Sequence, residues 1–203
     1  MKIKISKSNS KLGLIPSVSL PPILTCRQIC PCQTDCYALK GRYRFQNVKN
    51  NLSNNLELYI TSPDQYFNEI KEAIDGGIVR YSYFRWHAAG DIVDENYFIR
   101  MVKLAEELPH VNFLAFTKKY ELVNNFIRVN GGLPENLNLV FSAWGNMIKV
   151  DNPFDLPVAY VRFKDENKNG FIPETALGCS GNCTSCLQCW SIKKKQSVVF
   201  DKH

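Results

Sequence analysis

Apolar residues return every three or four positions in several stretches of the chain, and short apolar runs lie between these stretches. The first spacing is typical of helices with one buried face, and the second is typical of buried strands. Because helices and strands then alternate, the pattern predicts an α/β fold, either a partial (β/α) barrel or an open parallel sheet. The predicted helices span 36–43, 46–60, 62–76, 94–108 and about 120–129, and the predicted strands span 20–25, 78–86, 111–116, 137–143, 157–163 and 197–200.

Residues with strong preferences for helix ends support two of these helices. Ser62 precedes Pro63, and Gln65 follows three positions after Ser62, which is the capping-box pattern of a helix start. Asp94 is predicted to cap the next helix, and Pro109 is predicted to stop it. The alternation of helices and strands therefore does not depend on hydrophobic spacing alone.

The chain has 203 residues, which is enough for one domain with its own core, and no stretch has the composition of a linker. We expect a single α/β domain over residues 1–203 with a cysteine loop near each end, at 26–36 and 179–189. No window approaches the roughly 18 apolar residues of a membrane-spanning helix. The basic N-terminus also lacks the apolar stretch of a signal peptide. We therefore expect a cytoplasmic protein without membrane contact.

Eight cysteines form two groups of four. The C-terminal group has the spacing C-x3-C-x2-C-x2-C, and the N-terminal group has the spacing C-x3-C-x-C-x3-C. Thiolates are soft ligands, so four of them in one short loop indicate a site for an iron–sulfur cluster or zinc. Disulfides are the alternative, but they belong to oxidising compartments, and no signal peptide points to one. The predicted metal ligands are Cys26, Cys30, Cys32, Cys36, Cys179, Cys183, Cys186 and Cys189.

The spacing favours iron–sulfur clusters, one or two, over zinc. Three short intervals in a single run suit a [4Fe–4S] cluster better than a zinc ribbon, although C-x2-C pairs also occur in zinc knuckles. Cys179, Cys183 and Cys186 have the C-x3-C-x2-C spacing of radical-SAM enzymes, in which S-adenosylmethionine chelates the fourth iron. Cys189 could occupy that iron instead, so the spacing does not by itself support binding of S-adenosylmethionine. In the N-terminal group, the C-P-C step requires a sharply turned backbone if both thiols bind one metal.

Polar residues follow the predicted strands, beginning with the first strand, which is expected to end at Cys26. Ligands of parallel α/β folds bind at the carboxyl ends of the strands, so one shared site is expected there. His87, close to Asp91, could act as a general acid, a general base or a metal ligand. The alternative is a buried histidine bonded to Asp91. The predicted catalytic residues are His87, Asp91 and Lys118, and the predicted cofactor-binding residues are Arg85, Trp86, Ser142 and Arg162.

The formal charge of +6 overstates the basic character of the chain. On two zinc ions or two [4Fe–4S]2+ clusters, eight thiolates would subtract eight charges and the metal centres would add four, which lowers +6 to +2. Lysine and arginine do cluster locally, at 40–44, 118–119 and 193–195, with Tyr43 and Trp190 nearby as possible stacking partners for bases. A nucleic-acid partner is one interpretation of these clusters, and a solvated basic surface is the other.

Several short motifs are distributed over the chain from about residue 24 onward. They are CYALKGRYRF at 36–45, NNLELYI at 54–60, FRWHAAGD at 84–91, FTKKY at 116–120, LPENL and FSAW within 133–144, CSGNCTSC and CW within 179–190, and VVFDKH at the end. Together these motifs resemble the phage gene product 88 family, which occurs in phages and mobile elements. The resemblance implies an iron–sulfur protein with a partial (β/α) barrel, distantly similar to radical-SAM barrels, and no settled reaction.

Three functional hypotheses follow. The first is a redox or radical-SAM-like enzyme, in which His87, Asp91, Lys118 and Arg162 bind a small-molecule or nucleotide-like substrate. The second is a zinc- or cluster-stabilised module that binds nucleic acid or a host protein without catalysis. The third is a structural metal protein that acts as a phage accessory factor.

Overall fold

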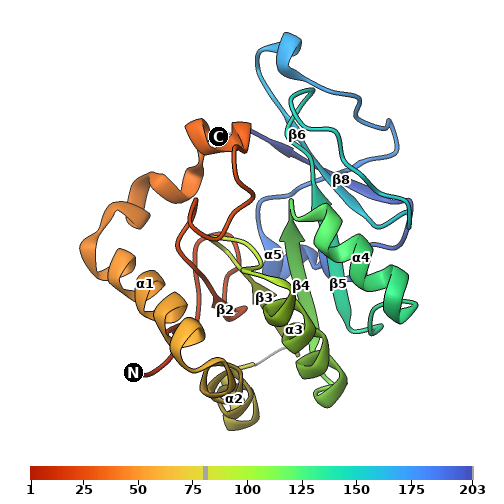
Figure 1. Cartoon of the computed structure of the whole chain (residues 1–203). Coiled ribbons are helices and arrows are strands. Elements are labelled where there is room, and N and C mark those ends of the chain that lie inside the picture. Colours follow the sequence, from red (N-terminus) through yellow and green to blue (C-terminus); the bar gives the residue numbers. More distant parts are fainter. Residues whose placement is uncertain (80–81, 203) are drawn as a thin grey trace.

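The computed structural model describes residues 1–79 and 82–202. In this part of the chain, eight strands form one sheet in the order β1-β2-β3-β4-β5-β6-β8-β7 (Figure 1). The strands are β1 (Ile5–Ser6), β2 (Ser17–Val18), β3 (Tyr83–Trp86), β4 (Asn112–Thr117), β5 (Leu137–Ser142), β6 (Val158–Arg162), β7 (Leu177–Gly178) and β8 (Ser197–Asp201).

The sheet is mostly parallel and follows the order of the chain. From β2 to β6 each strand lies next to the following one, and every pair is parallel. β8 continues this series beside β6, β7 pairs with the far side of β8, and β1 is an antiparallel edge strand beside β2. Within the described residues β1 and β7 do not pair with each other, so the sheet is open. The predicted α/β class with an open parallel sheet is confirmed.

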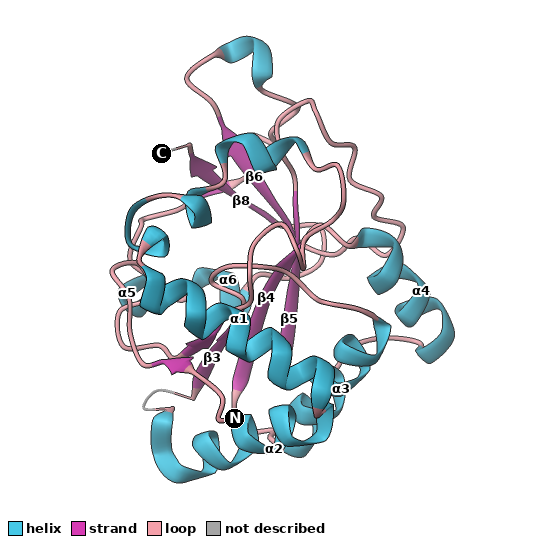
Figure 2. Cartoon of the chain, turned by 60° about the vertical axis from the view of Figure 1, so that its left-hand side comes forward, coloured by secondary structure: helices cyan, strands magenta, loops and turns pink. Residues whose placement is uncertain are grey.

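The two faces of the sheet are covered very differently. Four long helices cover one face, and two short helices from the C-terminal cysteine loop cover the other (Figures 1 and 2). The long helices lie close to the predicted ranges, because their apolar residues recur at helical spacing. The helices are α1 (Gln46–Thr61), α2 (Pro63–Ala73), α3 (Glu95–Glu107), α4 (Tyr120–Asn130), α5 (Cys183–Cys186) and α6 (Gln188–Ser191).

Each face of the sheet has its own apolar core. Beneath the long helices, buried aromatic rings meet edge to face, for example Tyr59 with Tyr97 at a centroid distance of 4.8 Å. On the other face a smaller cluster joins Leu114 and Val140 of the sheet to Trp190 of α6. The C-terminal cysteine loop is therefore part of the packed structure rather than a surface appendage.

The helix ends agree with the sequence in one case and differ in another. The Asp94 side chain accepts a hydrogen bond from the Tyr97 backbone N–H, as a helix cap does. Pro63 begins α2 as predicted, but the Ser62 side chain makes no cap bond, so the predicted capping box is wrong. A π-helical turn, Ile74–Ile78, follows directly after α2.

Two predicted elements before α1 are also wrong. Residues 20–25 form turns rather than a strand, because Pro21 and Pro22 have no backbone N–H to donate to a neighbouring strand. The strand beside β3 is β2, only two residues long, so the first strand does not end at Cys26. The predicted helix 36–43 consists of two 3-10 turns, at Tyr37–Leu39 and Gly41–Arg44, since Lys40 between them is extended.

The remaining predicted strands are found. The predicted strand 78–86 corresponds to β3, and residues 80 and 81 lie outside the described residues. Predicted strands 111–116, 137–143, 157–163 and 197–200 correspond to β4, β5, β6 and β8. His203, at the end of the last predicted motif, also lies outside the described residues.

Candidate site formed by two cysteine loops

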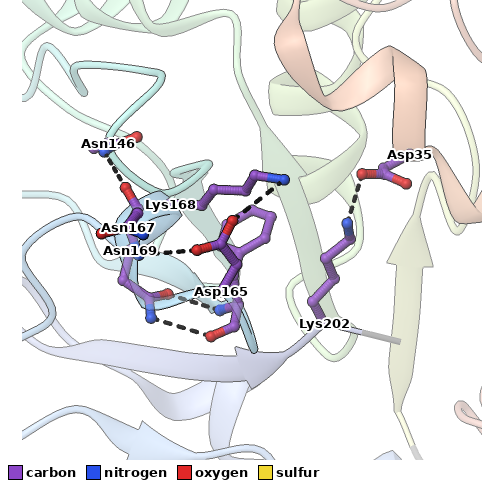
Figure 3. Close-up of polar contacts among 8 residues, drawn as sticks. Asp35, Asn146, Asp165, Asn167, Lys168, Asn169 and Lys202 are labelled. Carbon is purple, nitrogen blue, oxygen red and sulfur yellow. Dashed lines mark hydrogen bonds and ion pairs between the residues drawn. The ribbon is translucent and has the colours of Figure 1, made fainter.

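The N-terminal cysteine loop, residues 26–36, extends beside the carboxyl end of the sheet. Arg27 lies over the ring of Tyr120, the first residue of α4, with 5.7 Å between the guanidinium carbon and the ring centroid. At the other end of the loop, Asp35 forms an ion pair with Lys202 at 2.5 Å, just after β8 (Figure 3). The loop is thus held against the ends of strands that are far apart in the sequence.

Lys118 places a positive charge near three thiols of this loop, Cys26, Cys30 and Cys32, and this charge favours their thiolate forms. The sulfur atoms of Cys30 and Cys32 are 2.7 Å apart. A hydrogen bond from Cys32 lowers the pKa of Cys30 to about 6, and the same bond raises the pKa of Cys32. Burial raises the pKa of Cys26 to about 11. Cys30 therefore ionises more readily than Cys26 and Cys32.

The C-terminal cysteine loop, residues 179–189, is docked on the open face of the sheet by backbone hydrogen bonds. The Cys179 N–H donates to the Val199 carbonyl at 2.9 Å, and the Cys183 N–H donates to the Lys11 carbonyl at 2.8 Å. The Asn138 side chain donates to the Cys189 carbonyl at 2.6 Å. These bonds come from three separate segments, so the position of the loop depends on the complete fold.

The local sequence explains how this loop turns. The Asn182 side chain accepts a hydrogen bond from the Ser185 N–H and caps α5, the single turn that carries Cys183 and Cys186. Leu187 has a left-handed conformation with φ 53°, which ends α5 and starts α6. Cys189 then follows on α6. The short turns therefore hold the thiols of one loop in one neighbourhood.

The four C-terminal thiols are free and partly exposed. Burial and the three other thiols of the loop raise the pKa of Cys189 to about 11, while the charge of Arg85 acts in the opposite direction. Among the described residues, however, no three Cys, His, Asp or Glu side chains converge on a point that could hold one metal ion. The loop has the donor set of a thiolate metal centre, and its thiols are neighbours, but its side chains are not arranged around a common centre.

Arg85, predicted to bind a cofactor, lies beside this loop. Its guanidinium carbon is 4.1 Å from the ring centroid of Phe116. Its charge lowers the pKa of both Cys183 and Cys189. Its Nε atom is buried and has no hydrogen-bond partner. Arg85 therefore supplies a positive charge where the thiols would become negative.

Asp91, Lys118 and Ser142 are brought together at the ends of β3, β4 and β5. The Lys118 ammonium donates to the Ser142 hydroxyl at 2.8 Å, and the Lys118 backbone N–H donates to the Asp91 carboxylate at 3.0 Å. Burial raises the pKa of Asp91, while hydrogen bonds from Thr117, Lys118 and Ile92 act in the opposite direction. The structure thus brings these three predicted site residues together.

His87 is buried and its partner differs from the alternative considered above. Its Nε2 atom lies 3.0 Å from the Tyr97 hydroxyl rather than against Asp91. Its Nδ1 atom is buried without a hydrogen-bond partner. Burial, followed by the charges of Arg85 and Lys119, lowers its pKa to about 3. His87 is thus a neutral imidazole in the core beneath the site.

Trp86 and Arg162 are not part of this site. Trp86 is fully buried under the long helices, where it stacks on Phe113 at a centroid distance of 6.1 Å. Arg162 is exposed and forms an ion pair with Asp201 at 3.5 Å. Trp190, suggested as a stacking partner for bases, is buried as well, and its indole N–H donates to the Phe84 carbonyl.

Lys11 is a residue that the sequence did not indicate. Its ammonium lies 4.3 Å from the ring centroid of Phe200, and its charge lowers the pKa of Cys183. Nothing local in the sequence points to Lys11, because it lies in a loop between β1 and β2 and reaches the site only through folding. Phe116 could have been found, since it alternates with Leu114 and Lys118 on one face of β4.

Comparison with known proteins gives one finding. A sequence model of the family described as Gene product 88 matches residues 2–192, which is most of the chain. No curated protein and no solved structure matches the chain. In the part of the chain that the structure describes, no helix has the length and apolar character needed to cross a membrane.

Proposed function

The chain belongs to the Gene product 88 family, and we propose that it is an iron–sulfur protein. In this proposal the thiols of Cys179, Cys183, Cys186 and Cys189 bind a [4Fe–4S] cluster on the open face of the sheet. The N-terminal loop, residues 26–36, provides a second thiolate site at the carboxyl ends of the strands. When bound, such clusters supply one-electron transfer.

One observation carries this proposal: eight free cysteines are divided between two loops, and each loop lies beside a cation, Arg85 or Lys118. All eight thiols lack a disulfide partner. Arg85 faces the C-terminal loop, and Lys118 faces the N-terminal loop. Neither cation forms an ion pair with a carboxylate among the described residues. Metal-bound thiolates in each loop would place negative charge next to the cation beside that loop.

The N-terminal loop is the more reactive of the two in this proposal. Lys118 and Ser142 lie beside it at the strand ends, which is where parallel sheets bind their substrates. A lysine and the nearby Arg27 suit an anionic group such as a carboxylate or phosphate. We therefore assign the protein a redox reaction on a small anionic substrate, with Lys118 and Arg27 binding and orienting that substrate.

The experiment is anaerobic reconstitution of the full chain with ferrous iron and sulfide, followed by analysis for iron, zinc and acid-labile sulfide. A brown protein with iron and sulfide in equal amounts is the expected result. Replacing Cys183 by serine should remove the share of iron bound by the C-terminal loop. The matched control is Ser185→Ala, two positions away, which should retain all of the iron.

The same preparation separates the alternatives. A colourless protein that contains zinc would contradict the iron–sulfur proposal and favour the metal-stabilised binding module. Cleavage of S-adenosylmethionine by the reduced protein would add radical chemistry, and its absence would leave redox chemistry without that cofactor. Binding to nucleic acid that weakens steeply with salt would favour the module, since phosphate contacts release counterions.

A further inference from the structure

Arg85 is a cation without a counter-charge on the open face of the sheet. Its guanidinium lies over the Phe116 ring at 4.1 Å, and its Nε is buried without a hydrogen-bond partner. No carboxylate of the described residues lies within ion-pair distance of it. A desolvated charge without a partner is costly to the fold. Such a residue is explained when a negative group binds next to it.

Lys11 repeats this arrangement next to Arg85. Its ammonium lies over the Phe200 ring at 4.3 Å, and it also has no carboxylate partner among the described residues. The rings of Phe116 and Phe200 touch edge to face, with their centroids 5.7 Å apart. Two cations, each held on an aromatic ring, therefore lie on neighbouring rings of the same sheet face.

Both cations lie beside the C-terminal cysteine loop. The Cys183 N–H donates to the Lys11 carbonyl at 2.8 Å, which fixes the backbone of the loop to the segment that carries Lys11. Cys183 and Cys189 pack against the same apolar cluster as Phe116 and Phe200. Besides the thiols, the titratable groups near Arg85 are Tyr37, Tyr43 and His87. Burial raises the pKa of both tyrosines and lowers the pKa of His87, so all three stay neutral.

The charge of a thiolate metal centre matches this cation pair. Four thiolates leave two negative charges in excess, both on Zn2+ and on a [4Fe–4S]2+ cluster. We propose that Arg85 and Lys11 are the charge-compensating pair of a metal centre at Cys179, Cys183, Cys186 and Cys189. The inference rests on the proposed function, but it holds for either metal. The pair lowers the cost of forming thiolates and thereby raises the affinity of the loop for metal.

The test uses Co2+ as a spectroscopic probe on the reduced full chain, because thiolate ligation gives it a charge-transfer absorption. Cys186→Ser identifies the part of this absorption that belongs to the C-terminal loop, and that part is followed in every variant. Arg85→Met is expected to weaken Co2+ binding about tenfold or more, as loss of an outer-shell partner does. It should also move half-loading to higher pH. Arg85→Lys should restore most of the affinity, since it keeps the charge.

Lys11→Met supplies an independent variant, with a smaller expected loss because Lys11 is more exposed than Arg85. Arg128→Met is the matched control. It removes the same charge from an exposed position on α4, where the Arg128 guanidinium donates a hydrogen bond to the Asn125 side chain, and it should bind Co2+ like the wild type. Circular dichroism of the metal-free proteins shows whether each variant is folded. If Arg85→Met does not fold, Co2+ binding by Lys11→Met and Arg85→Lys is compared with the wild type instead.

The two proposals fail in different ways. If the wild type shows no Co2+ absorption that depends on Cys186, the C-terminal loop is not a metal site, and the proposed function fails. If the wild type binds Co2+ but folded Arg85→Met and Lys11→Met bind it equally well, the charge-compensation inference is wrong. A loss in Arg85→Met that Arg85→Lys does not restore would also overturn it, because the charge would then not be the cause.

Discussion

His87 is held neutral by its surroundings, and this has a consequence for acid stability. An unfolded histidine has a pKa of about 6.5, whereas in the folded protein burial lowers the pKa of His87 to about 3. Between these values the unfolded chain binds more protons than the folded chain. Stability is therefore complete above the unfolded pKa and decreases as the pH falls from about 6.5 toward 3.

His87→Asn should remove this acid sensitivity. Asparagine tolerates the left-handed backbone found at His87, where φ is 56°. The decrease in the free energy of unfolding between pH 7.5 and pH 5 should be smaller by about 2 kcal/mol than in the wild type. Urea denaturation at a series of pH values measures it. The exposed His110 provides the control, and His110→Asn should follow the wild type at every pH.

Gly90 is required by the space around it. Its φ is 81°, and a Cβ atom there would lie 2.7 Å from both the Leu20 carbonyl and the Thr25 hydroxyl. We expect Gly90→Ala to lower the free energy of unfolding by about 2 kcal/mol or more, from backbone strain and steric overlap together. Gly132→Ala, where a Cβ meets open space without a left-handed φ, should change it little. Equal effects of the two substitutions would contradict this account.

At the scale of elements, α6 anchors the C-terminal cysteine loop through one buried side chain. Trp190 is 8 % exposed, lies edge to face with Tyr83, and donates its indole N–H to the Phe84 carbonyl. Trp190→Ala should lower the free energy of unfolding by about 3 kcal/mol. It should also allow proteases to cut after Lys193 in the folded protein.

Trp190→Phe serves as its control. Phenylalanine fills most of the space but cannot donate to the Phe84 carbonyl, so a smaller loss of stability is expected and the loop should stay protected. If Trp190→Ala is as resistant to protease as the wild type, α6 does not depend on this anchor.

Elements with long periodic patterns could be predicted from the sequence, whereas very short ones could not. α3 and β4 have enough apolar residues at a regular spacing to be recognised. β2 has two residues, and its pairing with β3 depends on tertiary contacts rather than on a pattern. In 20–25, Leu20 is buried but Ile23 and Leu24 are exposed, and the two prolines cannot donate to a neighbouring strand. The position of the first strand could therefore not be predicted from the local sequence.

The candidate site could be predicted only in part for the same reason. Strand ends are visible in the sequence, so Asp91, Lys118 and Ser142 were placed together correctly. The contact between Cys183 and Lys11 joins residues from opposite ends of the chain, and no local pattern contains it. Arg162 could not be separated from the others because a strand end alone does not say which face its side chain occupies.

At the scale of the whole molecule, one ion pair joins the N-terminal cysteine loop to the last strand. Asp35 lies 2.5 Å from Lys202 (Figure 3). It also lies 3.6 Å from Lys40. The hydrogen bond from Lys202 lowers the pKa of Asp35. The pair is therefore formed above the ordinary carboxyl pKa and is lost as the pH falls through the lowered value.

Asp35→Asn should loosen both segments without unfolding the protein. Because the pair is exposed to solvent, we expect no measurable change in the urea midpoint. Amide hydrogen exchange should become faster at 26–36 and at the end of β8. Lys202→Met should have the same effect, and the double variant should add nothing. Exchange in the wild type should approach that of the variants at high salt, and an additive double variant would show that the two residues act separately.

The order of the strands also says when the C-terminal loop can assemble during synthesis. A ribosome delivers the chain amino end first, so β2 through β6 can each join the edge left by the strand before. β8 alone must enter between β6 and β7, and residues 179–189 connect β7 to β8. The loop can therefore take its folded position on the sheet only after β8 has been synthesised. Any metal that it binds is therefore acquired after β8 has been made, and not while the earlier strands are being synthesised.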